Sequence, residues 1–435
     1  MNYEESLSYL LSLGHETLTI KLGLRNTELL LQSLGHPQES YQSVQIAGTN
    51  GKGSTAVILD SICRAAGMKT GLFTSPHLIS ITERIVIGGH EISTHDFARH
   101  TNTVRIVAEE LLSQGRLDAL PTFFEQVTAT ALLAFKEADV AMAILETGLG
   151  GRLDATTVAS AATVAITPLA LDHQEYLGET LAEIAAEKAA IIRPGVNAII
   201  APQPPPALEV ILQRCRECLV TPQIVSERQA SIHSTTSDGR FRVTLETSEA
   251  RYENILVGLR GRHQILNASV ALELAESLSQ QGFDIPTAAI VEGIQTANHP
   301  GRLELLDNSP PLLLDGAHNP SGAQALRSYL EEFASGRLTL IFGAMKDKKL
   351  EEISAILFPL ADRLILTRVD NPRSAEVSDL RQLASGLLSD EKIAATSSVS
   401  EALALAKETT PSNGLICVTG SLYLLGATKK ELADR

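Results

Sequence analysis

The stretch IAGTNGKGST at residues 46–55 carries the residue types of a phosphate-binding loop, but in an unusual spacing. In the common pattern G-x-x-x-x-G-K-[ST] the lysine directly precedes the hydroxyl residue, whereas here Gly53 separates Lys52 from Ser54. Glycines let backbone N–H groups converge on phosphate oxygens, and a following helix presents its positive end to the same anion. Lys52 can add a charge near the β- and γ-phosphates, and Ser54 a hydroxyl for phosphate or Mg²⁺. Because a strand-like run precedes the loop and a helical pattern follows it, we predict a working phosphate loop.

Two further side chains follow apolar runs of strand type. Glu146 lies at the end of the run 139–148 and opens the glycine-rich segment ETGLGGRLDAT. Open α/β sheets bind ligands at the carboxyl ends of their strands, and one or two carboxylates with water suit Mg²⁺. We therefore predict that Glu146 binds a metal ion, although a strand-end acid can also simply face water. His173 follows the next run, 161–167, so it can converge with Glu146 at one sheet edge; a lone loop histidine would otherwise be structural.

The C-terminal third repeats this arrangement. LDGAHNP at 314–320 ends an apolar run, and its Asp315 and His318 precede a helical stretch whose N-terminus points at whatever binds there. VTGSLYLLG at 418–426 is another strand-to-helix turn, with the hydroxyl of Ser421. Two sets of strand-end loops predict a cleft between two domains.

The elements that position these residues follow from hydrophobic periodicity. Strands are predicted at 42–47, 69–73, 139–148, 161–167 and 196–202, with a hairpin at 83–92. Helices are predicted at 54–67, 94–113, 122–137, 180–192, 263–280 and 285–296. Residues 220–260 alternate polar and apolar types, which predicts antiparallel hairpins on an otherwise parallel sheet, and the proline-rich segment 202–206 predicts a semi-rigid turn.

A second α/β pattern begins after a cluster of Pro, Gly and Asn residues near 299–310. Its strands are predicted at 312–316, 338–343, 363–367 and 415–420, with helical stretches between them. We therefore expect an α/β protein of two domains. Residues 1–300 would form a P-loop-type domain with a mixed, mostly parallel sheet, and residues 301–435 a smaller Rossmann-like α/β domain.

The composition narrows the class of function. The 435 residues include 51 acidic and 36 basic ones, for a formal net charge of −15, and no Lys/Arg stripe favours a nucleic-acid partner. The N-terminus is acidic, without the basic and apolar regions of a signal peptide, and no apolar run approaches the length of a membrane span. We expect a cytoplasmic monomer with no membrane partner. Cys215 and Cys218 have metal-ligand spacing, but without a second pair we favour a structural role.

The motifs together resemble the folylpolyglutamate synthase/dihydrofolate synthase family, within the ATP-dependent Mur ligase superfamily. The resemblance covers nearly the whole chain and includes the shortened phosphate loop. In the family's order, the motifs are AGTNGKGS, FTSPHL, TFFE, ETGLGGRLDAT, LDHQEYLGETLAEIAAEKA, GRHQILNA, PGRLE, LDGAHNP, FGAMKDK and VTGSLYLLG. It implies an amide ligase: ATP phosphorylates a carboxylate to an acyl phosphate, the amino group of L-glutamate attacks, and a tetrahedral intermediate expels phosphate. Mg²⁺ and cationic groups would offset the charge that gathers on the phosphoryl group.

The resemblance also implies roles for individual residues. The ATP site would comprise Gly51, Lys52, Gly53, Ser54, Asn267, Arg302 and Asp315. Two Mg²⁺ ions would be bound by Ser54, Ser75, Glu146 and His173. The catalytic set would be Lys52, Glu146, His173 and Lys188. Glutamate would contact His318 and Ser421. The pterin substrate would contact Leu22, Gly23, Leu24, Arg25, Thr122, Phe123, Phe124, Glu125, Leu153, Asp154 and Ala155.

The resemblance changes the role that we expect for Lys188. Read alone in the helical stretch EIAAEKAAII, it is an exposed or ion-paired lysine. By motif it matches a lysine that is carbamylated in the superfamily, which turns a cation into a carboxylate-like metal partner. The sequence departs from the family's pattern at His299, where Trp is often found, at Ala190, where Gly is frequent, and at Thr157, where Asn is common. The change at His299 affects how adenine or the domain hinge is expected to pack. None of the three changes removes a group that the chemistry needs.

The expected activity is bifunctional: dihydropteroate plus glutamate gives dihydrofolate, and folates plus glutamate give polyglutamates. A folylpolyglutamate synthase without the first activity is the nearest alternative. A cell-wall ligase acting on a nucleotide-sugar peptide shares the loop, but it would need an additional N-terminal domain, and about 45 residues precede the loop here. A non-catalytic nucleotide-binding module is the alternative of another class; the joint presence of Lys52, Glu146, His173, Lys188 and His318 is evidence against it.

Overall fold

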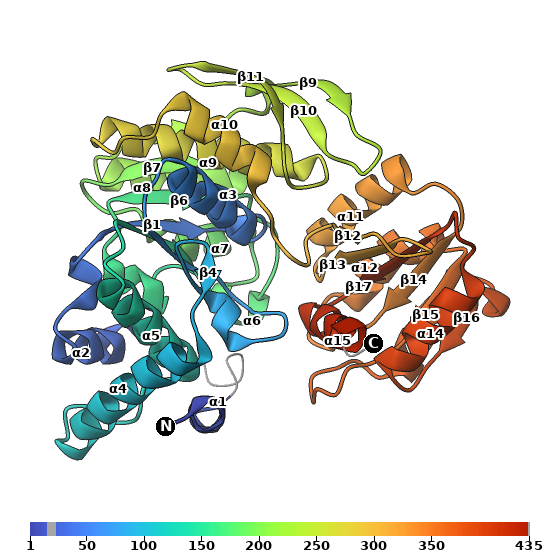
Figure 1. Cartoon of the computed structure of the whole chain (residues 1–435), viewed down its shortest axis with the longest axis horizontal. Coiled ribbons are helices and arrows are strands. Elements are labelled where there is room, and N and C mark those ends of the chain that lie inside the picture. Colours follow the sequence, from blue (N-terminus) through green and yellow to red (C-terminus); the bar gives the residue numbers. More distant parts are fainter. Residues whose placement is uncertain (15–22, 434–435) are drawn as a thin grey trace.

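The computed structural model describes residues 1–14 and 23–433, which form two α/β bodies that lie side by side (Figure 1). In the first body, the described residues form a sheet of eight strands, β1 (Gln42–Ala47), β2 (Thr70–Phe73), β3 (Ile85–Ile87), β4 (His90–Glu91), β5 (Met142–Glu146), β6 (Thr163–Ile166), β7 (Asn197–Ile200) and β8 (Gln223–Ile224). Their order is β4-β3-β2-β5-β1-β6-β7-β8. The strands from β2 to β8 in this order run parallel, and β3 pairs antiparallel with both β2 and β4. The prediction of a mixed, mostly parallel sheet is confirmed.

Helices cover both faces of this sheet, so its central strands β1, β2, β5, β6 and β7 are almost wholly buried. They are α1 (Tyr3–Ser12), α2 (Arg25–Ser33), α3 (Lys52–Ala65), α4 (Thr94–Ser113), α5 (Phe123–Glu137), α6 (Gln174–Leu177), α7 (Leu181–Ala189), α8 (Pro205–Glu217), α9 (His263–Gln280) and α10 (Thr287–Thr296). Met142 and Ile144 of β5 pack on the face covered by α3, α9 and α10, whereas Ala143 and Leu145 pack on α5 and its neighbours. On the latter side, α7 and α8 cover β6 and β7. No helix within the described ranges is long and apolar enough to span a bilayer.

The prediction for residues 220–260 was wrong in one respect. Only β8 joins the large sheet, by parallel pairing with β7. The antiparallel strands β9 (Ala230–Thr235), β10 (Phe241–Glu246) and β11 (Arg251–Leu256) form a separate sheet, at the top of Figure 1. Phe241, Val243 and Ile255 on one face of that sheet share a core with α9 and α10. The alternating pattern therefore reflects a sheet with one buried face, which a helix layer covers.

The prediction of a simple turn at 202–206 was also wrong, because α8 begins within the proline run. Pro204 is the N-cap and Pro205 opens the helix, where a missing N–H removes no hydrogen bond. On this helix Cys215 and Cys218 are buried in an apolar core, and the Cys218 thiol donates to the carbonyl of Ile192. The helices α1 and α2 were not predicted from the sequence either.

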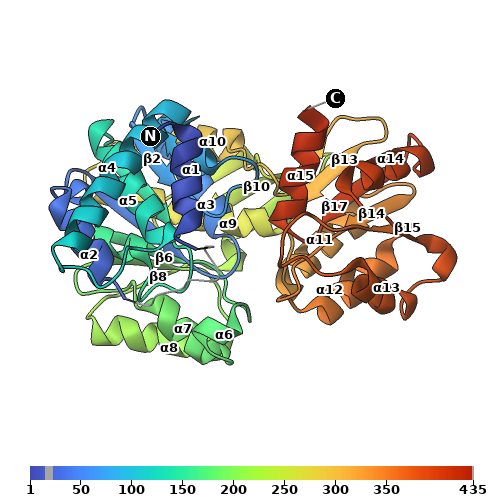
Figure 2. The same ribbon diagram turned by 90° about the horizontal axis from the view of Figure 1, so that it is seen from below.

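The second body is a smaller doubly wound sheet (Figure 2). Its strands are β12 (Glu304–Leu306), β13 (Leu312–Asp315), β14 (Leu338–Phe342), β15 (Arg363–Leu366), β16 (Ile393–Ala395) and β17 (Leu415–Thr419), in the order β12-β13-β17-β14-β15-β16. All are parallel except β12. One face is covered by α11 (Pro320–Phe333), α12 (Leu350–Leu357) and α13 (Val377–Ser385), the other by α14 (Val399–Thr409) and α15 (Leu422–Ala433). The four predicted strands are present; β12 and β16 were not predicted.

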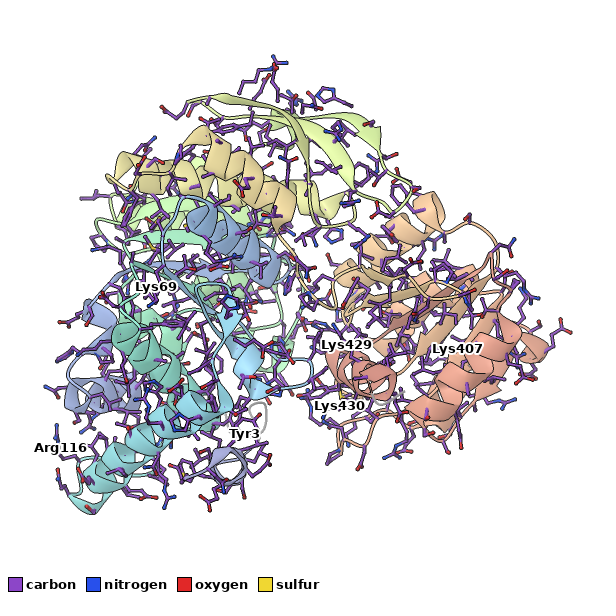
Figure 3. The ribbon with its side chains drawn as sticks, viewed as in Figure 1. Tyr3, Lys69, Arg116, Lys407, Lys429 and Lys430 are labelled. Atoms are coloured by element: carbon purple, nitrogen blue, oxygen red, sulfur yellow. The ribbon has the colours of Figure 1, made fainter. Side chains whose placement is uncertain are left out.

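Hydrogen bonds join the two bodies, and a further one holds the start of the second body in place. Arg262 makes two 2.8 Å hydrogen bonds to the carboxylate of Glu332 on α11, and the hydroxyl of Tyr329 donates to the carbonyl of Asp238. Within the second body, Lys429 of α15, labelled in Figure 3, donates to the Glu304 carboxylate on β12 at 2.8 Å. The bodies therefore contact each other directly as well as through the linker.

The packing of α10 on α3 allows only glycine at position 293. A Cβ built on Gly293 would lie 2.3 Å from the Cα of Ile62, which belongs to the backbone of α3. Gly293→Ala should therefore force the helices apart and lower the free energy of unfolding by about 1–3 kcal/mol in urea denaturation. Gly386→Ala is the control, because Gly386 has φ −80° and its Cβ would lie 3.7 Å from the nearest atom. Equal effects of the two substitutions would contradict the close approach.

Candidate active site

The carboxyl ends of the parallel strands in both sheets face a cleft of about 650 Å³ between the bodies. It is lined by residues from both parts of the chain, and most predicted site residues are among them. These are Gly51, Lys52, Gly53, Ser54, Ser75, Thr122, Phe124, Glu125, Glu146, Leu153, Asp154, Ala155, His173, Lys188, Asn267, Arg302, Asp315, His318 and Ser421. The predicted cleft between two domains is present.

The other predicted pterin-site residues that the structure describes are not among those that line the cleft. Phe123 is buried, with its ring 5.4 Å from the guanidinium of Arg84. Gly23, Leu24 and Arg25 belong to the segment at the start of α2, apart from the lining residues. Leu22 lies outside the described residues.

The phosphate loop is held open by backbone contacts. The N–H groups of Thr49 and Asn50 donate to the carbonyl of Pro168 at 3.2 and 3.1 Å, which ties the loop to the segment after β6. Gly51 has φ 86°, and a Cβ there would lie 2.3 Å from Oδ1 of Asn267. The helix α3 then begins at Lys52 without a side-chain cap, so its first N–H groups remain available to an anion.

Glu146 ends β5 beside this loop. Its Oε2 accepts the N–H of Ser75 at 3.0 Å and lies 3.2 Å from the position of a Cβ on Gly53. Burial raises the pKa of Glu146, and the charge of Lys52 opposes this shift. A carboxylate has about four acceptor positions, so Glu146 keeps capacity for a cation.

The donor groups around Glu146 fit magnesium. Among the described residues, no three His, Cys, Asp or Glu side chains gather to hold a metal ion by themselves. A cation beside Glu146 would therefore take further ligands from the hydroxyls of Ser54 and Ser75, from water and from phosphate, and this oxygen-rich set is what Mg²⁺ prefers. His173 lines the same cleft, in the left-handed conformation with φ 52°, and its Nε2 lies 3.9 Å from Oδ1 of Asp172.

Lys188 is buried on α7, with 4% of its surface exposed. Burial, followed by the positive charge of Lys52, lowers the pKa of Lys188 to about 7. A large fraction of its amine is therefore uncharged near neutral pH, which is the form that reacts as a nucleophile.

Two acids predicted to touch the pterin substrate also hold loops in place. Asp154 accepts the N–H of Leu149 at 2.9 Å and closes the glycine-rich turn after β5. Glu125 accepts the N–H of Thr122 at 2.7 Å in a capping box, and the hydroxyl of Thr27 on α2 at 3.0 Å. Both acids line the cleft, and in the structure they accept hydrogen bonds that hold the walls of the cleft in place.

On the other side of the cleft, strand-end residues bind their own backbone. Asp315 accepts the N–H of Leu303 at 2.9 Å and so ties the linker to the end of β13. Nδ1 of His318 lies 2.8 Å from the carbonyl of Gly316 and must donate to it, which leaves Nε2 as the acceptor. The hydroxyl of Ser421 donates to a backbone carbonyl after β14 at 3.0 Å. Burial lowers the pKa of His318 to about 4, so its ring is neutral at pH 7.

One carboxylate joins the two sides. Oδ1 of Asp172 accepts from Nζ of Lys348 at 2.9 Å, and its Oδ2 accepts from Nδ2 of Asn319 at 3.1 Å. Nε2 of His318 lies 3.8 Å from the same carboxylate. Asp172 follows β6 in the first body, whereas the other three belong to the second. This cluster is a buried polar contact across the cleft.

The charges explain the pKa of Asp172. Burial alone would raise it, but the positive charges that His173, Lys348 and His318 can carry hold it well below its ordinary value. Burial lowers the pKa of both histidines to about 4. Lys348 is therefore the cation that stabilises the carboxylate at neutral pH.

The roles of Asp172 and Lys348 were missed from the sequence, although both lie in motifs singled out there. Asp172 precedes His173 in LDHQEYLGE, and Lys348 ends FGAMKDK after β14. Their position next to strand ends was the available signal. Arg373 also lines the cleft, but no motif pointed to it.

Comparison with known proteins identifies the class. Residues 46–275 match the Mur ligase middle domain, and residues 301–422 match the glutamate ligase domain of Mur ligases. The two bodies and their shared cleft are thus those of a Mur-type ligase.

The family follows from individual relatives. Dihydrofolate synthase/folylpolyglutamate synthase of Bacillus subtilis is 33% identical over 95% of both chains. Folylpolyglutamate synthase of Mycobacterium tuberculosis, solved with ADP, is 31% identical and covers 100% of this chain and 99% of its own, with a TM-score of 0.91. A bifunctional folylpolyglutamate synthase/dihydrofolate synthase solved with Mn, AMPPNP and L-glutamate is 29% identical, covers 100% and 98%, and has a TM-score of 0.84. The chain belongs to the folylpolyglutamate synthase/dihydrofolate synthase family, as its motifs indicated.

The buried pair of Asp172 and Lys348 should be important for stability. Each side chain is 11% exposed, so Lys348→Met would leave a largely buried carboxylate without its cation. The expected loss in the free energy of unfolding is about 3 kcal/mol at pH 7, measured by urea denaturation. The loss should shrink below pH 4, because the depressed pKa of Asp172 stabilises the fold only above the ordinary aspartate value of about 3.9.

Lys346→Met is the matched control. Lys346 is exposed, and its Nζ donates to the carbonyl of Pro372, so the expected change is within about 0.5 kcal/mol. The Asp172→Asn/Lys348→Met variant should lose less than the sum of the single changes. Strictly additive losses would show that the two groups do not interact.

Proposed function

We propose that this chain is an ATP-dependent ligase that adds L-glutamate to dihydropteroate and to folates. The observation that carries the proposal is the single cleft in which the phosphate loop and Glu146 on one side face His318 and Ser421 on the other. The names of the relatives, and the ADP, AMPPNP, Mn and L-glutamate bound in the two solved structures, support it. We assign residues 1–300 to nucleotide and pterin binding and residues 301–435 to glutamate ligation. The protein would act as a monomer in the cytoplasm.

ATP would bind with its triphosphate on the loop and the N-terminus of α3. Gly51 to Ser54 supply N–H groups, Lys52 supplies charge, and Asn267 packs against the loop at Gly51. Arg302 and Asp315, beside the linker, would contact the rest of the nucleotide. When bound by Glu146, Ser54, Ser75 and His173, two Mg²⁺ ions would supply positive charge that stabilises the phosphoryl group in transfer.

The pterin substrate would occupy the part of the cleft beyond Glu146. Phe124 offers an aromatic face there, and Leu153 and Ala155 offer apolar contacts, in a wall held by Glu125 and Asp154. We keep Leu22, Gly23, Leu24, Arg25 and Phe123 as proposed contacts of the pterin substrate, as the sequence motifs imply. The substrate carboxylate would then point at the γ-phosphate over the loop, which is the geometry an acyl phosphate requires.

Glutamate would bind on the opposite wall. The neutral His318 presents Nε2 as an acceptor for an ammonium N–H, and Ser421 lies at the N-terminal end of α15, which favours a carboxylate. The amine would attack the acyl carbon after losing a proton, and the tetrahedral intermediate would expel phosphate. The amide and ADP are the products.

The first test is ADP release by the purified chain with Mg²⁺-ATP and L-glutamate, in parallel with dihydropteroate and with tetrahydrofolate. Glutamate-dependent turnover on both acceptors is expected. Turnover on tetrahydrofolate alone would leave a folylpolyglutamate synthase without the first activity. ATP binding with no ADP from either acceptor would contradict the ligase function and leave a non-catalytic nucleotide-binding module.

Lys188 gives a second test, since we propose that it works as a carbamate. Its amine, with a pKa of about 7, would add to CO₂ and release a proton, giving a buried anion near the cation site. Lys188→Ala should lower kcat about a hundredfold or more, and acetate or propionate should restore part of it.

The control for this experiment is Lys407→Ala. Lys407 is exposed on α14, away from the cleft (Figure 3), and its replacement should leave kcat within twofold of the unchanged chain. Near-normal activity of Lys188→Ala would show that this lysine is structural. A large loss that no short carboxylate repairs would exclude the carbamate as its working form.

A further inference from the structure

The linker between the two bodies touches the phosphate loop through His299. Nδ1 of His299 lies 3.2 Å from Oγ of Ser54. Its Cε1 lies 3.0 Å from the position that a Cβ would take on Gly53. The imidazole thus lies against the corner of the loop formed by Gly53 and Ser54, on the side of Glu146, whose Oε2 lies 3.2 Å from the same Cβ position. His299 itself is not among the residues that line the cleft.

The direction of one of the hydrogen bonds at Ser54 follows from its neighbours. Nδ2 of Asn267 donates to Oε1 of Gln264 at 2.8 Å, so the amide nitrogen of Gln264 faces the other way. That nitrogen donates to Oγ of Ser54 at 3.4 Å. One lone pair of the Ser54 oxygen is thereby used, and the remaining lone pair and the hydroxyl hydrogen are shared between His299 and the cleft. Asn267, Gln264 and Ser54 are all buried, so solvent does not compete readily for these bonds.

We propose that His299 is a positioning residue for Ser54. In this proposal Nδ1 of His299 accepts the hydroxyl hydrogen, which leaves the second oxygen lone pair of Ser54 free for the cation. The inference rests on the proposed function, in which Ser54 binds Mg²⁺ and the triphosphate. Without this acceptor, the hydroxyl hydrogen could rotate toward the cation and repel it.

The linker itself is fixed, which makes His299 a defined acceptor. The N–H of Arg302 donates to the carbonyl of His299 at 3.3 Å, and the next residue, Leu303, is held by Asp315 at 2.9 Å. The orientation of Ser54 in the first body therefore depends on a segment anchored to the first long strand of the second body.

Two substitutions distinguish the effect of the acceptor nitrogen of His299 from the effect of its ring packing. His299→Phe keeps an aromatic ring but has no acceptor, whereas His299→Asn offers Oδ1 close to the place of Nδ1. Binding of a non-hydrolysable ATP analogue is measured by titration calorimetry with and without Mg²⁺. For His299→Phe we expect metal-free affinity within about twofold, and a five- to tenfold smaller gain on adding Mg²⁺, as for one lost hydrogen bond. His299→Asn should keep the gain within about twofold.

Several outcomes would overturn the proposal. One is an unchanged Mg²⁺ gain in His299→Phe, and another is an equal loss in the Phe and Asn variants, which would mean that the ring acts by packing. The Ser54→Ala/His299→Phe variant should bind no more weakly than Ser54→Ala, so additive losses would also contradict it. Thermal unfolding checks that each variant is folded, and His299→Leu replaces the Phe variant if that one is not.

The same titration distinguishes a failure of the role of His299 from a failure of the proposed ligase function. If the unchanged chain shows no Mg²⁺-dependent gain, the cation site fails and the role of His299 fails with it. If the unchanged chain shows the gain and releases ADP with glutamate, the ligase function stands, and the variants alone decide the role of His299.

Discussion

Holding charge in a place largely shielded from water is the constraint on which the rest of the structure depends. Glu146, Asp172 and Lys188 are all largely buried around the cleft, and each is stabilised differently. Asp172 has a lysine from the other body, whereas burial raises the pKa of Glu146 and lowers that of Lys188. An unpaired buried charge costs several kcal/mol, so the last two are best accommodated when a cation, phosphate or modification completes their surroundings. The cleft is therefore suited to ligands whose charges match these groups.

The same constraint explains why several acids in the cleft bind backbone. Loops without regular structure must still satisfy their N–H groups. Asp154, Glu125 and Asp315 do this with oxygens aimed at the amides of their own or neighbouring loops. These hydrogen bonds fix the walls of the cleft within the chain itself. In the proposed function, the face of the aromatic pterin ring would then contact side chains such as Phe124 and Leu153.

Features that depend on residues close together in the chain could be predicted from the sequence, whereas contacts between distant residues could not. Apolar runs and glycine-rich turns are local, so the parallel sheet, the loop at Gly51 and the strand-end place of Glu146 were predicted. The separate sheet of β9 to β11 was not, because alternation shows one buried face but not what covers it. The pairing of Asp172 with Lys348 joins residues 176 positions apart, and no local pattern indicates such a contact. The linker's contact with Ser54 is non-local in the same way.

An acyl phosphate must meet an amine before it meets water, which requires the two bodies to be aligned when it forms. The contact at Asp172 is suited to this task. Its neighbour in the chain is His173 in the first body, and its partner Asn319 is the N-cap of α11 in the second. Asn319 uses both ends of its amide, since Oδ1 accepts the N–H of Gly322 at 2.7 Å while Nδ2 donates to Asp172. One carboxylate thus fixes a helix terminus in the second body relative to a strand end in the first, so any shift between the bodies must break buried hydrogen bonds.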